Sequence, residues 1–367
     1  MNMKKYIYEH ENWTDFSWED TAINAVFGEV RLMQGKIIGL MNSLGFAAKA
    51  EAMLKSLTLD VVKSSEIEGE LLNYNQVRSS LARRLGINTA GLVPSDRHIE
   101  GVVEMMLDAT QRWDSPLTEE RLFSWHAALF PTGYSGLYKI EVAKYRTGAM
   151  QVVSGAMGHE KVHYEALAPE SVSAEMSKFL DWFNNEQQLD PVLKAAIAHF
   201  WFIIIHPFDD GNGRIARAIT DMLLARAEGS GERFYSISSQ VLIEKKQYYG
   251  VLQRVQHSTG DITEWIEWFL YCLKNAMKVT EQASQGILRK AEFWKLHEQT
   301  PINERQRFMI NMLFDGFKGK LKTSKWAKIT KVSTDTALRD IKDLINKGVL
   351  QETGEGGRST NYELKKL

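Results

Sequence analysis

The chain has 367 residues and a mass of 41.9 kDa, more than one hydrophobic core usually organises, so we expect at least two units. Its 44% hydrophobic and 25% charged residues are those of a globular protein and exclude a disordered or fibrous chain. The net charge of −1 hides an asymmetry, because residues 301–367 hold 14 Lys/Arg against 8 Asp/Glu and the preceding 300 residues sum to −7.

Cysteine content and hydropathy indicate the compartment. Cys272 is the only cysteine, which excludes an internal disulfide and a cysteine-based zinc site. No run reaches the ~20 apolar residues that a membrane span requires, and residues 1–13 lack the apolar stretch of a signal peptide. We therefore expect a cytoplasmic protein with no membrane partner.

Apolar residues recur at helical spacing along most of the chain, which predicts a mainly α-helical fold. In the N-terminal part, Leu54, Leu57 and Val61 share one face of a helix. Gly69 gives this helix a C-terminal stop, because glycine readily adopts the left-handed conformation that ends helices. The expected helix therefore ends within residues 64–69.

The next change of pattern predicts a β-hairpin followed by a buried helix. Gly and β-branched residues replace the helical spacing between residues 145 and 169, which predicts a hairpin over 152–168. Pro191 then opens the segment 192–205, which is apolar almost all round. We expect this helix in the core.

The segment after this helix, residues 206–217, reads HPFDDGNGRIAR and has the features of a phosphate-binding loop. Gly211 and Gly213 allow a tight turn and a close approach to a ligand. The chain then enters a helix over 215–227, whose N-terminal N–H groups favour anions. A dinucleotide fingerprint is excluded because a helix precedes the loop, and a P-loop because Gly-Lys-Ser/Thr is absent.

Four side chains of this segment suit phosphate chemistry with a divalent cation. Arg214 and Arg217 lie three residues apart on the first helical turn, where two guanidinium groups can hold a polyphosphate. Asp210 offers a hard oxygen ligand of the kind Mg²⁺ prefers. His206 can accept a proton near neutral pH. Each residue alone is more often structural, but their combination in one loop favours a catalytic site.

After a long helix over 262–298, the C-terminal part predicts a self-contained unit. The expected elements are helices over 304–313, 324–330 and 333–346 and a hairpin whose turn covers 354–361. This order is that of a winged helix-turn-helix. We therefore divide the chain into an N-terminal helical region (1–100), a catalytic core (101–298) and a winged helix-turn-helix domain (299–367).

Residues 206–217 resemble the Fic signature H-x-F-x-(D/E)-G-N-G-R-x-x-R and match all eight of its fixed positions. The resemblance implies an all-α core that transfers AMP from ATP to a Ser, Thr or Tyr hydroxyl of a protein. It further implies that His206 deprotonates this hydroxyl and that Asp210 holds Mg²⁺ or Mn²⁺. The residues implied to bind ATP in this segment are Gly211, Asn212, Gly213, Arg214, Ile215, Ala216 and Arg217.

Ser64-x-x-x-Glu68-Gly69 resembles the inhibitory motif (S/T)-x-x-x-E-(G/N) of Fic proteins. The resemblance implies that Glu68, with Ser64 beside it, pairs with Arg217 and blocks productive binding of the γ-phosphate. A solvated acidic helix end is the plainer alternative. The inhibitory interpretation is favoured because the signature is also present.

Two further stretches resemble Fic counterparts. The hairpin over 152–168, with Val153, Ser154 and Gly155, resembles the flap that aligns a target segment by strand addition. Tyr248 and Tyr249 resemble the paired tyrosines that line the nucleotide site, although aromatic residues on a helix more often belong to the core.

Three functions remain open on the sequence. The leading hypothesis is an autoinhibited adenylyltransferase. Hydrolytic removal of AMP at the same site competes with it, and a transcription regulator with a Fic core as sensor is the third. For the tail we expect docking of protein partners or a second subunit, with DNA binding as the alternative. Asp335, Asp340 and Asp343 lie on the same helix as the tail's cations and would repel the phosphate backbone.

Overall fold

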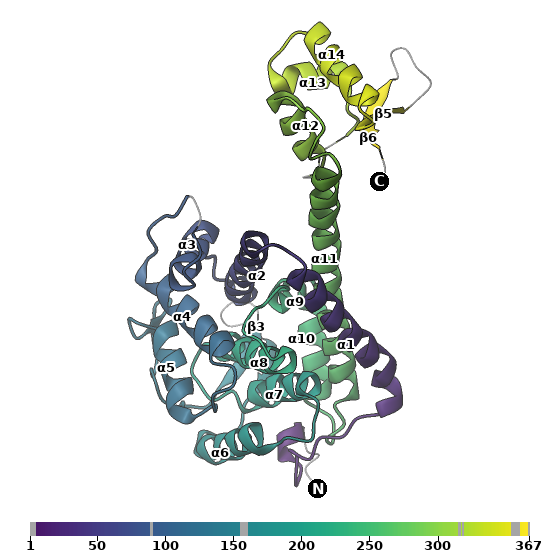
Figure 1. Ribbon diagram of the computed structural model, residues 1–367. Coiled ribbons are helices and arrows are strands. Elements are labelled where there is room, and N and C mark those ends of the chain that lie inside the picture. Colours follow the sequence, from purple (N-terminus) through teal and green to yellow (C-terminus); the bar gives the residue numbers. More distant parts are fainter. Residues whose placement is uncertain are drawn as a thin grey trace. The chain divides into compact units, whose positions relative to one another are not determined.

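The computed structural model describes residues 5–88, 91–154, 161–314, 317, 319–353 and 360–365 (Figure 1). The described chain is mainly helical with three short antiparallel hairpins, which confirms the predicted fold class. No helix in this part of the chain combines the length and the apolar character needed to cross a membrane.

Two compact units make up the chain, Met1–Thr280 and Glu281–Leu367. The predicted ranges 1–100 and 101–298 thus belong to one unit as far as Thr280, because helices of both ranges pack in one core. The second unit begins before the predicted residue 299, because Phe293 lies in the hydrophobic core of the C-terminal helices.

The first unit contains most of the helices and two of the hairpins. Its elements are η1 (Ile7–Glu9), α1 (Asp20–Asn42), α2 (Phe46–Ile67), α3 (Tyr74–Arg84), α4 (Arg97–Gln111), α5 (Glu119–Leu129), β1 (Tyr134–Ser135), β2 (Tyr138–Lys139), β3 (Gln151–Ser154), β4 (Lys161–Glu165), α6 (Pro169–Asn185), α7 (Pro191–Ile205), α8 (Asn212–Glu228), α9 (Ile237–Ile243) and α10 (Lys245–Val255). Helix α11 (Thr263–Leu296) begins in this unit and continues into the second.

Helices α7 and α8 pack against each other in the centre of this unit (Figure 1). Helix α7 is buried on nearly every side, as its continuous apolar sequence predicts, and Pro191 occupies its first turn. The Asp190 carboxylate caps it by accepting the Val192 N–H at 2.8 Å. The two helices therefore hold the loop that joins them, residues 206–211, on a rigid base.

Helix α2 carries the predicted inhibitory motif at its C-terminal end. The helix stops at Ile67 and Gly69 has a φ of +86°, as expected for a glycine that ends a helix. The Gly69 and Glu70 N–H groups bond back to the Glu66 and Ser65 carbonyls, each at 3.0 Å. These bonds fix the acidic residues that follow the helix.

The predicted hairpin is present as β3 and β4, which pair in antiparallel register with an irregularity between Val152 and Val153. Residues 155–160, with Gly155, lie outside the described residues, as do the side chains of Val153 and Ser154. The assignment of this hairpin as a flap therefore stays a prediction.

The second unit has the predicted order of elements, namely α12 (Glu304–Phe314), α13 (Thr323–Thr330), α14 (Thr334–Asn346), β5 (Leu350–Thr353) and β6 (Asn361–Leu364). Its core includes Trp326, Ile341, Leu344 and Val349, which are fully buried. The tip of the expected wing, residues 354–359, lies outside the described residues.

Candidate active site

Hydrogen bonds between its own residues stabilise the loop between α7 and α8. Asn212 Oδ1 accepts the Phe208 N–H at 2.9 Å and Asn212 Nδ2 donates to the Phe208 carbonyl at 2.7 Å. Gly211 has a φ of +83°, and a Cβ there would lie 2.9 Å from the Phe130 ring. The Asn212 amide therefore stabilises the loop conformation. Its second Nδ2 hydrogen stays available to donate to a phosphate oxygen.

His206 ends α7 in the left-handed conformation, with φ of 51°. Its Nδ1 lies 3.2 Å from the Ile203 carbonyl, an acceptor, so the proton sits on Nδ1 and Nε2 keeps its lone pair. Burial lowers the pKa of His206 to about 4, with nearby Arg146 acting in the same direction. The ring is therefore neutral near pH 7 and can accept a proton.

A buried arginine fixes the backbone around His206. The Arg146 guanidinium is 2% exposed and donates to the carbonyls of His206, Gly148 and Leu167 at 2.8, 2.9 and 2.6 Å. The Arg146 N–H also bonds to the Pro207 carbonyl at 2.9 Å. One side chain thus joins the catalytic loop to the segments on both sides of the β3–β4 hairpin.

Asp210 lies at the edge of the site with its carboxylate held in place. Its Oδ1 accepts the Gly211 N–H at 2.6 Å and its Oδ2 accepts the Ser135 hydroxyl. Among the described residues, no group of three or more His, Cys, Asp or Glu side chains could hold a metal ion. A single carboxylate nevertheless suits Mg²⁺ bound mainly by substrate phosphates and water.

Arg217 is almost completely buried and is held by the end of α2. Its Nη2 pairs with Glu68 Oε1 at 2.8 Å and also donates to the Ser64 carbonyl at 2.8 Å. Its Nε donates to Ser64 Oγ at 2.8 Å. A Cβ at Gly213 would lie only 2.0 Å from Glu68 Oε1, so this carboxylate sits against the first turn of α8. Glu68 therefore occupies the place that favours an anion.

Arg214 meets a second carboxylate, which sequence reasoning missed. Its Nη1 pairs with Glu70 Oε2 at 2.8 Å, and its guanidinium stacks over the Phe130 ring. Glu70 Oε1 also contacts His98 Nε2. Burial raises the pKa of Glu70, but the bond from His98 and the charge of Arg214 outweigh it, so that pKa is lowered. Glu70 is thus held as a carboxylate.

Both arginines keep one unsatisfied nitrogen. Arg217 Nη1 and Arg214 Nε are buried and have no hydrogen-bond partner among the described residues. Buried guanidinium N–H groups are costly unless they are paired. Neither arginine is among the residues that line the neighbouring cavity, so these donors become available to a ligand only when the guanidinium groups move.

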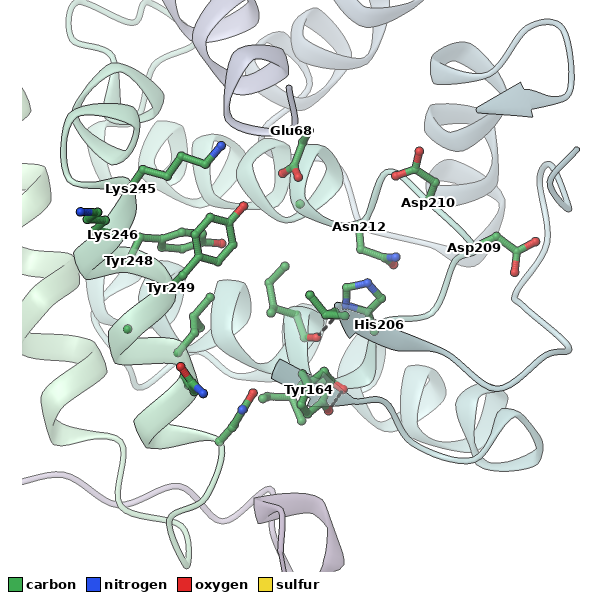
Figure 2. Close-up of a pocket in the computed structure, with 18 residues that line it drawn as sticks. Glu68, Tyr164, His206, Asp209, Asp210, Asn212, Lys245, Lys246, Tyr248 and Tyr249 are labelled. Atoms are coloured by element: carbon green, nitrogen blue, oxygen red, sulfur yellow. Dashed lines mark hydrogen bonds between the residues drawn. The ribbon is translucent and has the colours of Figure 1, made fainter. Parts of the chain in front are cut away.

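A cavity of about 730 Å³ opens beside these groups. Figure 2 shows Glu68 projecting toward it, with His206 and Asn212 on one side and Tyr248 and Tyr249 on the other. Its lining consists of Glu68, Val152, Tyr164, Ile203, Ile204, His206, Asp209, Asp210, Asn212, Gly213, Lys245, Lys246, Tyr248, Tyr249, Gly250, Leu252, Gln253 and Gln256. Ile215 and Ala216 are fully buried in α8 and are not part of this lining.

The two tyrosines differ in their surroundings. Tyr248 is buried, and its hydroxyl lies 3.0 Å from His199 Nε2, while His199 Nδ1 lies 2.9 Å from the Thr220 hydroxyl. Because Thr220 donates to the Ala216 carbonyl, His199 Nδ1 carries the proton and Tyr248 is the donor to Nε2. Tyr249 is 41% exposed and is free to contact a ligand through its ring.

Another contact that the sequence does not reveal holds the end of α2. Lys245 on α10 borders the cavity, and its Nζ donates to the Ile67 carbonyl at 2.6 Å. Ile67 is the last residue of α2, so this lysine satisfies a carbonyl at the helix end. Arg214, Arg217 and Lys245 thus each bind the segment 64–70.

Two family models match the chain. Residues 116–224 match the Fic/DOC family, and residues 6–87 match a domain of unknown function (DUF4172). The Fic/DOC match runs from before α5 into α8, as far as residue 224, and therefore includes the loop 206–211 and both arginines.

Curated relatives carry the same enzyme name. The chain is 39% identical over 153 residues to "Protein adenylyltransferase fic-1" of Caenorhabditis elegans, which covers 39% of this chain and 28% of that protein. It is 35% identical over 227 residues to "Protein adenylyltransferase Fic" of Culex quinquefasciatus, which covers 59% and 40%. The chain thus spans less than half the length of these relatives.

The fold has a counterpart over nearly the full length. A crystal structure of a Fic family protein from Desulfovibrio desulfuricans G20 superposes with a TM-score of 0.53 at 21% identity, covering 94% of this chain and 95% of that chain. At 21% identity, this structural similarity establishes the fold and nothing about activity.

Proposed function

We propose, from the premise that residues 116–224 belong to the Fic/DOC family, that this chain transfers AMP from ATP to a hydroxyl side chain of a target protein. The observation that carries the proposal is the neutral His206, with Nε2 unprotonated, on a loop that leads into the anion-favouring end of α8. Relatives named protein adenylyltransferase support it.

In the proposed reaction His206 Nε2 takes the proton of the target hydroxyl, and the oxygen forms a bond to the α-phosphorus of ATP. The bond from that phosphorus to the β-phosphate oxygen breaks, and pyrophosphate leaves. Asp210 would hold Mg²⁺ or Mn²⁺, which neutralises phosphate charge when bound. Arg214 and Arg217 would hold the β- and γ-phosphates, and their unsatisfied nitrogens supply donors for this.

The contacts of the segment 64–70 support autoinhibition as part of this function. Glu68 holds Arg217 and Glu70 holds Arg214, so carboxylates occupy both guanidinium groups that would bind the triphosphate. Glu68 and Glu70 must leave before ATP binds in the productive position, because neither arginine can pair fully with a carboxylate and a phosphate group at the same time. These two ion pairs support the proposal that the segment 64–70 inhibits nucleotide binding.

Labelled ATP tests the proposed reaction. Purified protein carrying Glu68→Gly, incubated with ATP alone, should label itself from ATP labelled at the α-phosphate but not at the γ-phosphate. Equal incorporation of the γ-label would indicate kinase chemistry and contradict the proposal. Release of AMP from an AMP-modified protein without any forward transfer would assign the site to hydrolysis.

The second ion pair gives a separate prediction. Glu70→Gln keeps the size of the side chain but removes the charge that holds Arg214, so we expect ATP to bind about 5-fold more tightly. Calorimetric titration with ATP measures this. Glu51→Gln is the matched control, because Glu51 pairs with Arg78 away from the cavity. Unchanged ATP affinity in Glu70→Gln would show that the Glu70–Arg214 pair does not oppose nucleotide binding.

A further inference from the structure

In the second unit, α13 and α14 are joined by the three residues Lys331 to Ser333. Lys331 adopts a left-handed conformation, with φ of 56°, and Ser333 Oγ caps α14 by accepting the Thr336 N–H at 3.2 Å. A turn of this length between two packed helices is typical of the helix-turn-helix motif, in which the second helix enters the DNA major groove. The antiparallel β5–β6 hairpin follows, as in a winged form.

Two of the three aspartates expected to repel DNA are committed to contacts inside the unit. Asp340 is 6% exposed and bonds to Arg305 at 3.0 Å and Asn303 at 3.2 Å. Asp343 pairs with Lys347 and accepts a bond from Gln306 at 2.8 Å. Asp340 is therefore buried and paired with Arg305, and Asp343 is paired with Lys347 although its side chain is 45% exposed. Whether these carboxylates oppose a polyanion stays a prediction that DNA binding tests.

The outward side of α13 and α14 is strongly basic. Among the described residues 319–347, the exposed cations are Lys320, Lys322, Lys328, Lys331, Arg339 and Lys342. Asp335 is the most exposed carboxylate residue in that range, and the Asp343 side chain, 45% exposed, is paired with Lys347. On α14, Asp335, Arg339 and Lys342 follow one another at helical spacing of three and four residues and thus share one stripe.

The same surface lacks the apolar contacts that a protein partner needs. Large hydrophobic side chains are exposed at several places in the described chain, but none of them lies in residues 319–347. Cores of protein–protein interfaces are rich in aromatic and aliphatic residues and poor in charge, whereas nucleic-acid interfaces are strongly positive. This surface therefore matches a polyanion better than a protein.

We propose that the second unit is a winged helix-turn-helix that binds double-stranded DNA through the outward side of α13 and α14. Arg339 and Lys342 on α14 face the groove and its edges, and Lys322, Lys328 and Lys331 contact the phosphate backbone. Each phosphate contact releases counterions, so the affinity should fall as salt rises. This binding is separate from the proposed AMP transfer.

Fluorescence anisotropy of the full chain with a labelled duplex of mixed sequence tests this proposal. With a duplex of about 30 base pairs at ~100 mM salt, we expect a dissociation constant in the micromolar range or below. Arg339→Ala with Lys342→Ala should weaken binding about 10-fold or more and reduce the slope of log K against log salt by about 2.

Two further variants make the result specific to this surface. Asp335→Asn removes the most exposed carboxylate and should tighten binding severalfold, a gain that misfolding would not produce. Lys36→Ala with Lys55→Ala is the control, because it removes the same charge from exposed positions of the other unit. Absent or salt-insensitive binding, or equal weakening by the control, would overturn the proposal.

Discussion

His206→Ala is expected to lower the rate of AMP transfer on the order of 1,000-fold, because general-base catalysis typically contributes two to four powers of ten. The affinity for ATP should change by no more than about twofold, since the ring accepts a proton and holds no phosphate. Rapid-mixing transfer rates and calorimetric ATP titration measure the two quantities. Transfer that persists in the variant would remove His206 from the mechanism.

A second substitution separates chemistry from backbone conformation. His206 is left-handed, a conformation that Asn tolerates better than Ala. His206→Asn should therefore preserve the loop and still lose the same activity, because the amide is no base. If His206→Asn retains transfer while His206→Ala does not, the imidazole is needed for loop structure alone.

The pH dependence provides an independent readout of His206. Its pKa is lowered to about 4, so the neutral, proton-accepting form persists as the pH falls through the ordinary histidine range. We therefore expect kcat/KM to hold from pH 8 down to about 5 and to decline only as the pH approaches 4. A decline centred near the ordinary value of about 6.5 would contradict the assigned environment.

Glu68→Gly is expected to raise AMP transfer, including self-modification, by on the order of 10- to 100-fold, as for coupling free energies of one to three kcal/mol. The substitution frees Arg217 and clears the first turn of α8, where Glu68 Oε1 now lies. Initial rates with a fixed ATP concentration measure the effect.

Glu66→Gly is the matched control for this prediction. Glu66 lies in the last turn of α2, two residues before Glu68, but pairs with Lys63 at 2.6 Å rather than with the arginines of α8. A glycine at Glu66, inside the helix, loosens the helix end at least as much as one at Glu68, which follows it. If Glu66→Gly activates as much as Glu68→Gly, the loosened helix end is the cause, and Glu68 is not the inhibitory group.

Local sequence patterns predicted those parts of the fold that depend on neighbours in the chain. The apolar run of α7, the glycine after α2 and the loop 206–211 each follow from the spacing of a few residues, and the structure has these elements at the expected places. The position of the α2 end beside α8 does not follow from local patterns, because it depends on how the two helices pack. Only the family resemblance anticipated the Glu68–Arg217 pair.

Contacts between distant segments could not be predicted. Nothing near Arg214 in the sequence indicates that Glu70 pairs with it or that His98 contacts Glu70, since the three residues come from three different segments. Arg146 likewise looks like an ordinary surface arginine until folding surrounds it with carbonyls. Helical spacing placed Asp340 on α14 but could not show that this side of α14 contacts Arg305.

Mass spectrometry of the Glu68→Gly protein after incubation with ATP and a cell lysate tests the central claim most directly. The account predicts peptides, from the protein itself or from lysate proteins, that carry one AMP on a Ser, Thr or Tyr hydroxyl. The same experiment with the doubly substituted Glu68→Gly, His206→Ala protein should give none. AMP-modified peptides at equal levels in both samples, or in neither, would contradict the account.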